Sequence, residues 1–276
     1  MLSSVLVIGL GLMGSNLALK LRTEGVRVYG EDISEEAYLS AVSSGAVEDS
    51  SYSKVDLVVL AMPINEIIDY LENPKDIKAK GLIDLGGTKK EICKIMNNFN
   101  IPSVGGHPLC GVADNSNFVE NINLYSNSTF ILSETSSTND EVKNLSLEMV
   151  KLLGANPIWL DPTTHDEIIA ITSHIPHLIS TALIGAAMRS YGLEEIMEFT
   201  SGGFDGATRL SRTNPDMIWG MLETNSESIG DFGQKFLQEL SNIFSMGGEN
   251  ELHKYIEDTV EWRRELADKF GERPLE

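Results

Sequence analysis

Residues 4–14 read SVLVIGLGLMG: a short run of Val, Leu and Ile is followed at once by a G-x-G-x-x-G pattern at Gly9, Gly11 and Gly14. A helical pattern, 15–23, comes next. In this setting the first glycine permits a tight turn, the second lets a pyrophosphate approach the backbone, and the third lets the helix pack closely on the strand. The stretch therefore predicts the first strand, turn and helix of a doubly wound α/β sheet, with a dinucleotide site at the turn. A glycine-rich turn without a ligand is the alternative.

A second apolar run, 26–30, leads to Asp32. A carboxylate at the end of this strand accepts hydrogen bonds from the ribose hydroxyls of NAD and repels the 2′-phosphate of NADP. No Lys or Arg between Val28 and Lys54 offsets that repulsion, so the sequence favours NAD. The residues expected to bind the cofactor are Gly9, Leu10, Gly11, Leu12, Met13, Gly14, Asp32, Met62 and Pro63. The last two follow the third expected strand, where a proline that merely starts a loop is the alternative.

Strand and helix patterns alternate as far as residue 160. Further strands are expected at 56–61, 81–85, 103–105, 129–132 and 157–160. Helical patterns lie between them at 35–43, 64–71, 89–98 and 140–153. Such alternation predicts right-handed crossovers and a mostly parallel, Rossmann-type sheet in a first domain, 1–160.

After Asp161 the strand signals stop. Helical periodicity is present at 163–191, 215–228, 231–246 and 249–269. These patterns predict an all-helical second domain, 161–276, and their apolar faces are more than a lone helical unit can cover, so we expect a homodimer through it. Pro176 lies inside the longest pattern and predicts a kink or break there, because proline lacks a backbone donor and its ring clashes with the preceding turn.

Composition restricts the classes of partner. The chain has 276 residues, 41 acidic and 21 basic, with a formal net charge of −20, so a nucleic acid or an anionic membrane surface is disfavoured as a partner. The sequence has no run of about 18 uninterrupted apolar residues, so we expect no membrane span. The apolar N-terminus lacks the basic start of a signal peptide. Two cysteines cannot form a disulfide framework, which fits a reducing cytoplasm.

One of the five histidines stands out by its place. His107 lies in VGGHPLCG, 104–111, next to flexible glycines at an expected strand end. Ligands bind outside the carboxyl ends of strands in such sheets, and a histidine there is suited to moving a proton at neutral pH. The alternative is a loop histidine that caps a backbone carbonyl. His165 and His253 have no comparable context.

The second half contributes two further histidines and one arginine. His174 and His177 are three residues apart, hence on one helix face. They are expected to contact substrate, although a buried structural role is an alternative. A metal site would need further ligands, which Asp166 or Glu167 could supply; we expect no metal. Arg209 follows the glycine-rich stretch 202–208, and a surface ion pair is its alternative role.

Several segments together resemble the prephenate and arogenate dehydrogenases of tyrosine biosynthesis. They are GLGLMG at 9–14, DLGGTKKEI at 84–92, GGHPLCG at 105–111, HDEIIAITSHIPHLISTAL at 165–183 and SGGFDGATRLSRTNPDMIW at 201–219. The segments occur in the family's order and cover nearly the whole chain. The resemblance implies a homodimeric enzyme that uses NAD to convert prephenate to 4-hydroxyphenylpyruvate by oxidative decarboxylation.

The resemblance also implies roles for single residues. His107 matches the catalytic histidine that hydrogen-bonds the ring hydroxyl of the substrate, Arg209 the arginine that holds a substrate carboxylate, and His177 a histidine of the same pocket. The family commonly has serine where Gly87 stands, and Thr88 is the candidate to replace it. Acidic residues that the family often has are absent at Ala113 and Gly206, which leaves the exact substrate open.

Three other functions remain as alternatives. Arogenate dehydrogenase, or a cyclohexadienyl dehydrogenase that accepts both compounds, differs only in the substrate side chain. A β-hydroxyacid dehydrogenase also starts with GLG-x-MG, but it needs a catalytic lysine after the Rossmann domain, and no lysine occurs between Lys151 and Lys235. An NAD-sensing module without catalysis would not explain His107, His177 and Arg209 together.

Overall fold

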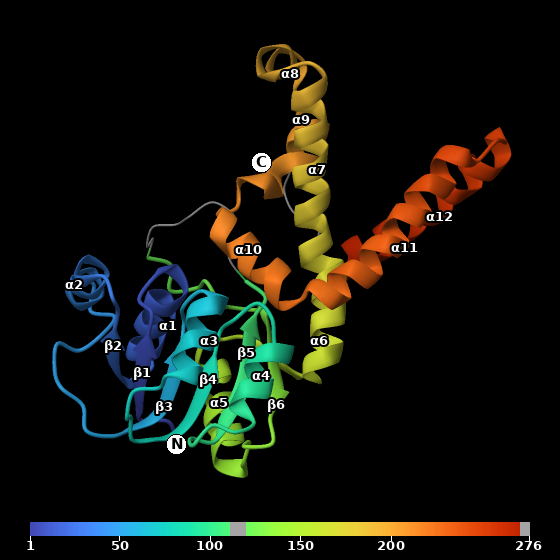
Figure 1. Cartoon of the computed structure of the whole chain (residues 1–276). Helices are drawn as coiled ribbons and strands as arrows, with labels where there is room; N and C mark the ends of the chain where they lie inside the picture. The colour runs from blue at the N-terminus through green and yellow to red at the C-terminus, as the bar shows by residue number, and fades with distance from the viewer. Residues whose placement is uncertain (111–119, 271–276) are drawn as a thin grey trace. The chain divides into compact units, whose positions relative to one another are not determined.

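The computed structural model describes residues 1–110 and 120–270, and its first part is a seven-stranded sheet (Figure 1). The strand order is β2-β1-β3-β4-β5-β6-β7. Neighbouring strands are parallel except β5 and β6, which pair antiparallel. The strands are β1 Ser4–Ile8, β2 Arg27–Glu31, β3 Val55–Leu60, β4 Ala79–Asp84, β5 Ser103–Pro108, β6 Thr129–Glu134 and β7 Asn156–Trp159. The expected doubly wound, mostly parallel sheet is therefore confirmed.

Helices cover both faces of this sheet (Figure 1). They are α1 Leu12–Thr23, α2 Glu35–Ser43, α3 Ile64–Glu72, α4 Lys90–Met96 and α5 Asp140–Leu152. One apolar cluster joins α1 and α5 to the strands, and a second cluster joins α3 and α4 to the opposite face. Every residue of β1 and β3 is buried, because a parallel sheet with helices on both faces has no solvent-facing side.

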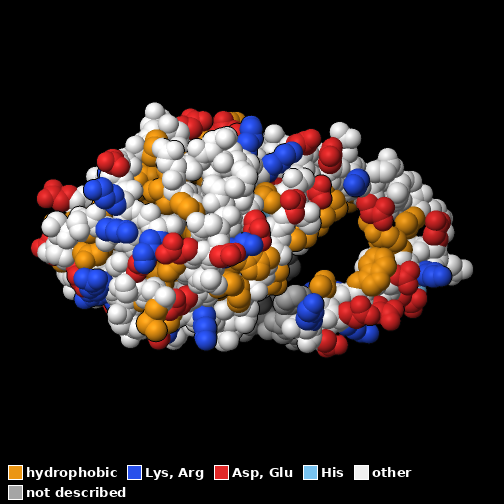
Figure 2. Space-filling model, turned by 90° about the horizontal axis from the view of Figure 1, so that it is seen from below, with side chains coloured by type: hydrophobic (Ala, Val, Ile, Leu, Met, Phe, Trp, Pro, Cys, Tyr) orange, Lys and Arg blue, Asp and Glu red, His pale blue; other side chains and the backbone are white. Residues whose placement is uncertain are grey.

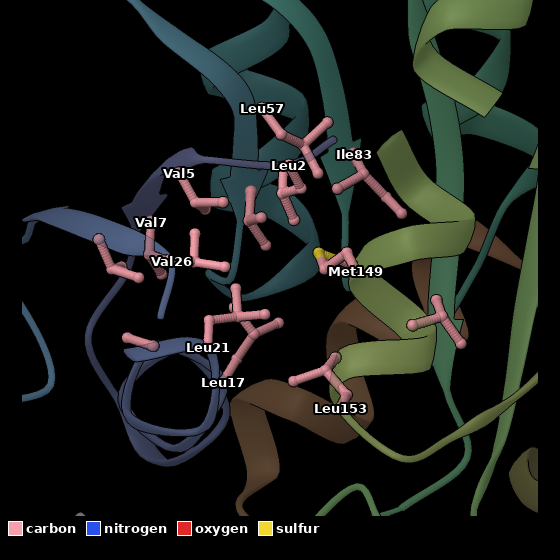
Figure 3. Close-up of a cluster of buried hydrophobic side chains, with 14 of the residues drawn as sticks. Leu2, Val5, Val7, Leu17, Leu21, Val26, Leu57, Ile83, Met149 and Leu153 are labelled. Carbon is pink, nitrogen blue, oxygen red and sulfur yellow. The ribbon is translucent and has the colours of Figure 1, made fainter. Parts of the chain in front are cut away.

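Figure 3 shows the first of these clusters. Leu17 and Leu21 of α1 point toward strand side chains, and Met149 of α5 enters the same cluster from its opposite end. These three side chains are fully buried, and burying a leucine or methionine side chain contributes about 1.5–3 kcal/mol. The first helix is thus fixed on the sheet, which holds the glycine-rich turn that precedes it.

The contacts divide the chain into two compact units. The first comprises Met1–His174 and Arg212–Ser226, and the second comprises Ile175–Ser211 and Glu227–Glu276. Besides the sheet, the first unit includes α6 Pro162–Ile169, the π-helical turn η1 Ala170–His174 and α10 Pro215–Thr224. The expected boundary after residue 160 follows the end of the strands, whereas the compact unit also takes in helices that pack on α3 and α4.

The second unit is helical throughout its described residues, as expected. Its helices are α7 Ile175–Ser190, α8 Leu193–Phe199, α9 Gly202–Thr208, α11 Ser226–Ser245 and α12 Glu249–Phe270, with a 3₁₀ turn, η2 Arg209–Arg212, after α9. Within this unit α9 packs against α7.

Pro176 does not break its helix. The chain stays helical from Pro162 to Ser190, and the five-residue π-helical turn η1 directly precedes the proline. A wider turn at this place relieves the clash between the proline ring and the preceding carbonyl. The continuous helix is long and apolar enough, by length and composition, to cross a membrane. A core helix of a soluble protein meets the same criteria, and this one carries the fully buried, polar His165 and Asp166.

The surface agrees with the charge balance of the sequence. On the face drawn in Figure 2, Lys and Arg side chains are scattered among Asp and Glu side chains. A basic cluster of the kind that binds phosphate backbones is not evident on that face. The absence of nucleic-acid and membrane partners stays a prediction.

Candidate active site

His107 lies within β5, not beyond its end as the sequence suggested. The strand continues to Pro108 because β6 pairs with it, with His107 opposite Ile131. The two preceding glycines serve packing rather than flexibility. A Cβ at Gly105 would lie 2.5 Å from Cys93 Sγ, and one at Gly106 would lie 2.4 Å from the backbone oxygen of Asp84. Only glycine therefore lets β4 and α4 approach the strand this closely, and the approach sets the position of the half-buried His107 ring.

The His107 ring is the first member of a chain of three side chains, which we call the histidine chain. Its Nδ1 lies 2.9 Å from His165 Nε2, and His165 Nδ1 lies 2.7 Å from Asp166 Oδ1. The two rings meet edge to face. His165 and Asp166 are fully buried, and the backbone N–H groups of Lys89 and Lys90 also donate to the Asp166 carboxylate, at 2.7 and 2.9 Å.

A buried ion pair holds the loop that connects β4 to α4. Lys89 Nζ pairs with Asp84 Oδ2, and both side chains are fully buried. The Asp84 carboxylate also accepts hydrogen bonds from the N–H groups of Gly86, at 2.7 Å, and Gly106, at 3.0 Å. A buried carboxylate is tolerated when it is paired and hydrogen-bonded in this way. The pair thus joins the β4–α4 loop to the strand that carries His107.

Both imidazoles of the histidine chain are held in the neutral form. Burial, followed by the neighbouring His165, Lys89 and His174, lowers the pKa of His107 well below 6.5. Burial also lowers the pKa of His165, although the hydrogen bond from its ring to Asp166 acts in the opposite direction. Near pH 7 the His107 ring is therefore uncharged and able to accept a proton.

The second ring nitrogen of His107, Nε2, lies on the side of Gly87. A Cβ added to Gly87 would be 3.9 Å from Nε2 and 3.8 Å from Ile64 Cδ1. These are ordinary contact distances, so the glycine leaves room for about one further atom group against Nε2. The hydroxyl that the resemblance expects at position 87 is therefore absent from a place next to the proposed base.

Thr88 is turned to another partner. Its side chain is fully buried, and its Oγ1 lies 2.8 Å from Thr224 Oγ1 on α10. Thr224 in turn donates to the carbonyl oxygen of Gly220, at 2.7 Å. Since a hydroxyl has one proton, Thr88 is the donor in the bond to Thr224. A contact between Thr88 and substrate stays a prediction, for which only a lone pair of the hydroxyl is available.

His174 takes the buried position that the sequence left as an alternative. It is 1% exposed, and its Nδ1 lies 3.3 Å from Asn225 Nδ2. Asn225 also donates to the carbonyl oxygen of Asp166, at 2.7 Å. The end of α10 is therefore fastened to the histidine chain, which explains why residues 212–226 belong to the first unit.

His177 and Arg209 belong to the second unit. His177 is half-buried on α7, and Arg209 is exposed at the end of α9. The two segments are neighbours, because Ser211 N donates to Ser180 Oγ at 3.0 Å. Among the described residues no carboxylate pairs with the Arg209 guanidinium, so the surface ion pair considered for it is not seen. Within residues 1–110 and 120–270 no group of three or more potential ligands could hold a metal ion.

The glycine-rich turn has the features that a dinucleotide requires. Gly9 has a φ of +96°, and a Cβ at Gly14 would lie 1.9 Å from the Gly9 carbonyl oxygen. Gly11 caps α1 without a side-chain hydrogen bond, and no atom of the residues that the structure describes lies within 4 Å of a Cβ there. The first N–H groups of a helix have no partner within the helix, so this helix start is suited to bind the pyrophosphate.

Asp32, which follows β2, and the loop after β3 lie beside the glycine-rich turn. Asp32 accepts hydrogen bonds from Leu10 N, at 2.6 Å, and Ser34 N, at 2.8 Å, so its carboxylate is held beside the turn. Met62 Cγ lies 2.8 Å from a Cβ built on Gly9, and Pro63 precedes α3 as its N-cap. The residues expected to hold the cofactor therefore adjoin one another.

Comparisons with known proteins match both halves of the chain. Residues 17–159 match the nucleotide-binding domain of prephenate dehydrogenase, and residues 161–258 match the prephenate dehydrogenase dimerization domain. The chain belongs to the prephenate dehydrogenase family. The family resemblance drawn from the motifs is thereby confirmed, and so is a nucleotide-binding domain followed by a helical one.

The similar proteins of the prephenate dehydrogenase family are named after different substrates. Prephenate dehydrogenase of Bacillus subtilis is 27% identical over 259 residues, which are 88% of this chain and 70% of that protein. Cyclohexadienyl dehydrogenase of Zymomonas mobilis is 24% identical over 87% of this chain and 86% of its own length. A solved prephenate dehydrogenase from A. aeolicus, in complex with hydroxyphenyl propionate and NAD⁺, has a TM-score of 0.87 at 26% identity and covers 96% of this chain and 99% of its own.

Sequence reasoning missed part of this site. The sequence gives His165 no special context, although His165 is the direct partner of His107, and it assigns neither Asp166 nor Asn225 to the site. The available signal was weak: His165 and Asp166 stand next to each other, four residues after the helix-capping Asp161, in a segment otherwise rich in isoleucine. Two adjacent polar residues that start an apolar helix are a reason to look for a buried partner.

Proposed function

We propose that this protein is an NAD-dependent prephenate dehydrogenase that converts prephenate to 4-hydroxyphenylpyruvate by oxidative decarboxylation, in tyrosine biosynthesis. The observation that supports it most directly is the neutral His107 ring, which is hydrogen-bonded at Nδ1 and has room at Nε2, in a chain of this family. Such a nitrogen can accept a proton from a substrate hydroxyl.

The cofactor is NAD. The turn from Gly9 to Gly14, with Leu10, Leu12 and Met13, would hold the pyrophosphate, and Asp32 would accept hydrogen bonds from the ribose hydroxyls. The Asp32 carboxylate beside the turn repels a 2′-phosphate and so selects against NADP. Bound there, NAD supplies the acceptor for the hydride that leaves the hydroxyl-bearing ring carbon of the substrate. Met62 and Pro63, which adjoin Gly9, close the same site.

His107 acts as the base toward the ring hydroxyl. As the carbon–hydrogen bond at the hydroxyl-bearing ring carbon breaks, the hydroxyl oxygen becomes electron-poor, and His107 Nε2 takes up the hydroxyl proton. The ring carboxylate departs as carbon dioxide, its bonding electrons make the ring aromatic, and the proton returns to the oxygen of the phenol. Hydride and carbon dioxide leave the substrate, and no net proton is released. A well-placed general base contributes about 10²–10⁴-fold to the rate.

Arg209 and His177 bind the substrate carboxylates, and His174 supports the site from its buried position. Arg209 forms a charge-assisted pair with one carboxylate, and His177 adds a hydrogen bond. The net charge of −20 opposes a dianionic substrate only weakly, because salt screens charges beyond about 8 Å. Exposed Arg209 is available for this role. His174, buried beside Asn225, contributes by supporting the chain to His107 rather than by direct contact.

The protein works as a cytoplasmic homodimer formed by its helical half. The dimerization domain of the family covers residues 161–258. Apolar side chains are exposed on α11 and α12 of the second unit, among them Leu237, Phe244, Ile256, Trp262 and Leu266. An exposed apolar surface of this kind is typical of a subunit interface.

The test is to assay prephenate and arogenate, each with NAD and with NADP. We expect turnover of prephenate with NAD to exceed the other three combinations by at least about tenfold. Faster turnover of arogenate would establish the alternative, which the similarity to a cyclohexadienyl dehydrogenase supports. Absence of turnover with both compounds would refute the proposal.

A further inference from the structure

We propose that His165 and Asp166 are positioning residues for His107: they hold its ring in the one tautomer that leaves Nε2 unprotonated on the side of Gly87. This inference rests on the proposed function for its catalytic consequence, whereas the tautomer itself can be measured without substrate. The argument proceeds from the carboxylate outward, because each hydrogen bond along the histidine chain fixes the direction of the next.

Asp166 determines the first bond. Its Oδ1 accepts the Lys89 N–H at 2.7 Å and lies 2.7 Å from His165 Nδ1, while its Oδ2 accepts the Lys90 N–H at 2.9 Å. An ionised carboxylate only accepts hydrogen bonds. His165 Nδ1 therefore carries a proton and donates it to Asp166.

His165 determines the second bond. A neutral imidazole has one N–H and one acceptor nitrogen, so His165 Nε2 is an acceptor. It lies 2.9 Å from His107 Nδ1. Two bare nitrogens at that distance would repel each other, and the acceptor of the fully buried His165 would lack a donor. His107 Nδ1 consequently carries the proton. Its Nε2 keeps a free lone pair, on the side where Gly87 leaves room for another atom group.

The reaction needs His107 in this tautomer, but it does not need a path that carries a proton from His107 to solvent. The proton that Nε2 takes from the hydroxyl returns to the product oxygen, so His165 and Asp166 need not carry it to solvent. While His107 holds two protons, its Nδ1–H donates more strongly to His165, which is supported by the Asp166 charge. The pair therefore both selects the reactive tautomer and stabilises the transient cation.

The charged and titratable groups around His107 come from several elements. His165 and Asp166 lie on α6, His174 in the π-helical turn, and Lys89 with its partner Asp84 at the β4–α4 loop. Lys89 and His174 disfavour a proton on His107, while Asp166 and Asp84 raise the pKa of His165. Removal of His165 changes the acceptor at Nδ1 but leaves the paired Lys89 and Asp84 in place.

Two variants of one position separate positioning from packing. His165→Phe keeps an aromatic ring but removes the acceptor, whereas His165→Gln places an amide oxygen where it can accept the His107 Nδ1–H. We expect His165→Phe to lower kcat for prephenate by about 100-fold or more, by analogy with the loss caused by a wrong tautomer in a triad, with KM within threefold. His165→Gln should recover at least a tenth of the activity. His253→Gln, which alters an exposed histidine on α12, is the matched control and should leave kcat unchanged.

The decisive readout is the ¹⁵N spectrum of the histidine rings in the full-length wild-type protein, with His107 assigned by its absence in His107→Asn. We expect a neutral His107 protonated at Nδ1, and the signal should shift toward the other tautomer in His165→Phe. A wild-type His107 protonated at Nε2 would overturn the inference, as would equal kcat values for both His165 variants and wild type. If His165→Phe does not fold, the wild-type spectrum and the activity of His165→Gln still decide. Failure to turn over prephenate and arogenate, with the expected tautomer present, would refute the proposed function alone.

Discussion

Replacement of His107 by asparagine tests the proposed base with little other disturbance. The asparagine amide reaches about as far as the Nδ1 edge of an imidazole. Its N–H₂ group can therefore still donate to His165 Nε2, which lies 2.9 Å from His107 Nδ1 in the wild type. The atom at the place of Nε2 is lost. The variant thus removes the proton acceptor while it keeps the histidine chain connected.

The expected loss follows from the role of that atom. General-base catalysis contributes about 10²–10⁴-fold, which corresponds to about 2.7–5.4 kcal/mol of transition-state stabilisation. We expect kcat to fall by this factor. KM for prephenate should change less than about threefold, because the carboxylate contacts assigned to Arg209 are untouched, and a loss in kcat alone marks an interaction made in the transition state.

The assay is the initial rate of NADH formation at saturating NAD, measured for His107→Asn, wild type and the control His253→Asn. The pH dependence adds a second readout. Because the pKa of His107 is lowered well below 6.5, the acid limb of kcat/KM in the wild type should lie below pH 6.5, with activity lost as pH falls through that pKa. His107→Asn should lack this limb. A kcat within a few-fold of wild type, with the acid limb retained, would refute the assignment of His107 as the base.

Three further outcomes are expected. Arg209→Gln should raise KM for prephenate by about tenfold or more, since a charge-assisted pair with a carboxylate is lost, with a smaller effect on kcat; an unchanged KM would remove Arg209 from the carboxylate site. Lys89→Met should lower the free energy of unfolding by about 3–5 kcal/mol in urea titrations, because it leaves the fully buried Asp84 unpaired, whereas Lys94→Met, at an exposed pair, should change it by about 0–1 kcal/mol. The lowered pKa values of the two rings in the histidine chain mean that the unfolded state binds more protons below pH 6.5; stability should therefore be full above pH 6.5 and decline on acidification below it, and a flat profile between pH 7 and pH 5 would contradict neutral buried rings.

Local patterns were sufficient for the sheet and its glycine-rich turn. The first expected strand, Ser4–Ile8, coincides with β1, and the other strands differ by a few residues at their ends. Gly9 and Gly14 are needed by backbone geometry, with a positive φ at the first and no room for a Cβ at the second. Such constraints act within a few residues along the chain, which is why they can be read from a motif.

The partners of His107 could not be read in the same way. Its bond to His165 spans 58 residues, the bond from Lys89 to Asp166 spans 77, and the bond from Asn225 to Asp166 spans 59. The local sequence around these side chains does not indicate which residue each of them will contact. The extension of β5 through His107 likewise depended on pairing with β6.

The sequence by itself determined the order of the strands and of the helices between them, the cofactor turn and the family of the chain. It did not indicate the short helices α8 and α9. Periodicity, glycine geometry and motif spacing are local properties, and they are present before the chain folds. Tertiary structure alone decided that the end of α10 returns to the sheet unit, that Thr88 is bound to Thr224, and that a buried carboxylate orients His107 through a second histidine. The physical reason is that a buried polar group must find its partner somewhere in the fold, and nothing in its local sequence states where that partner will be.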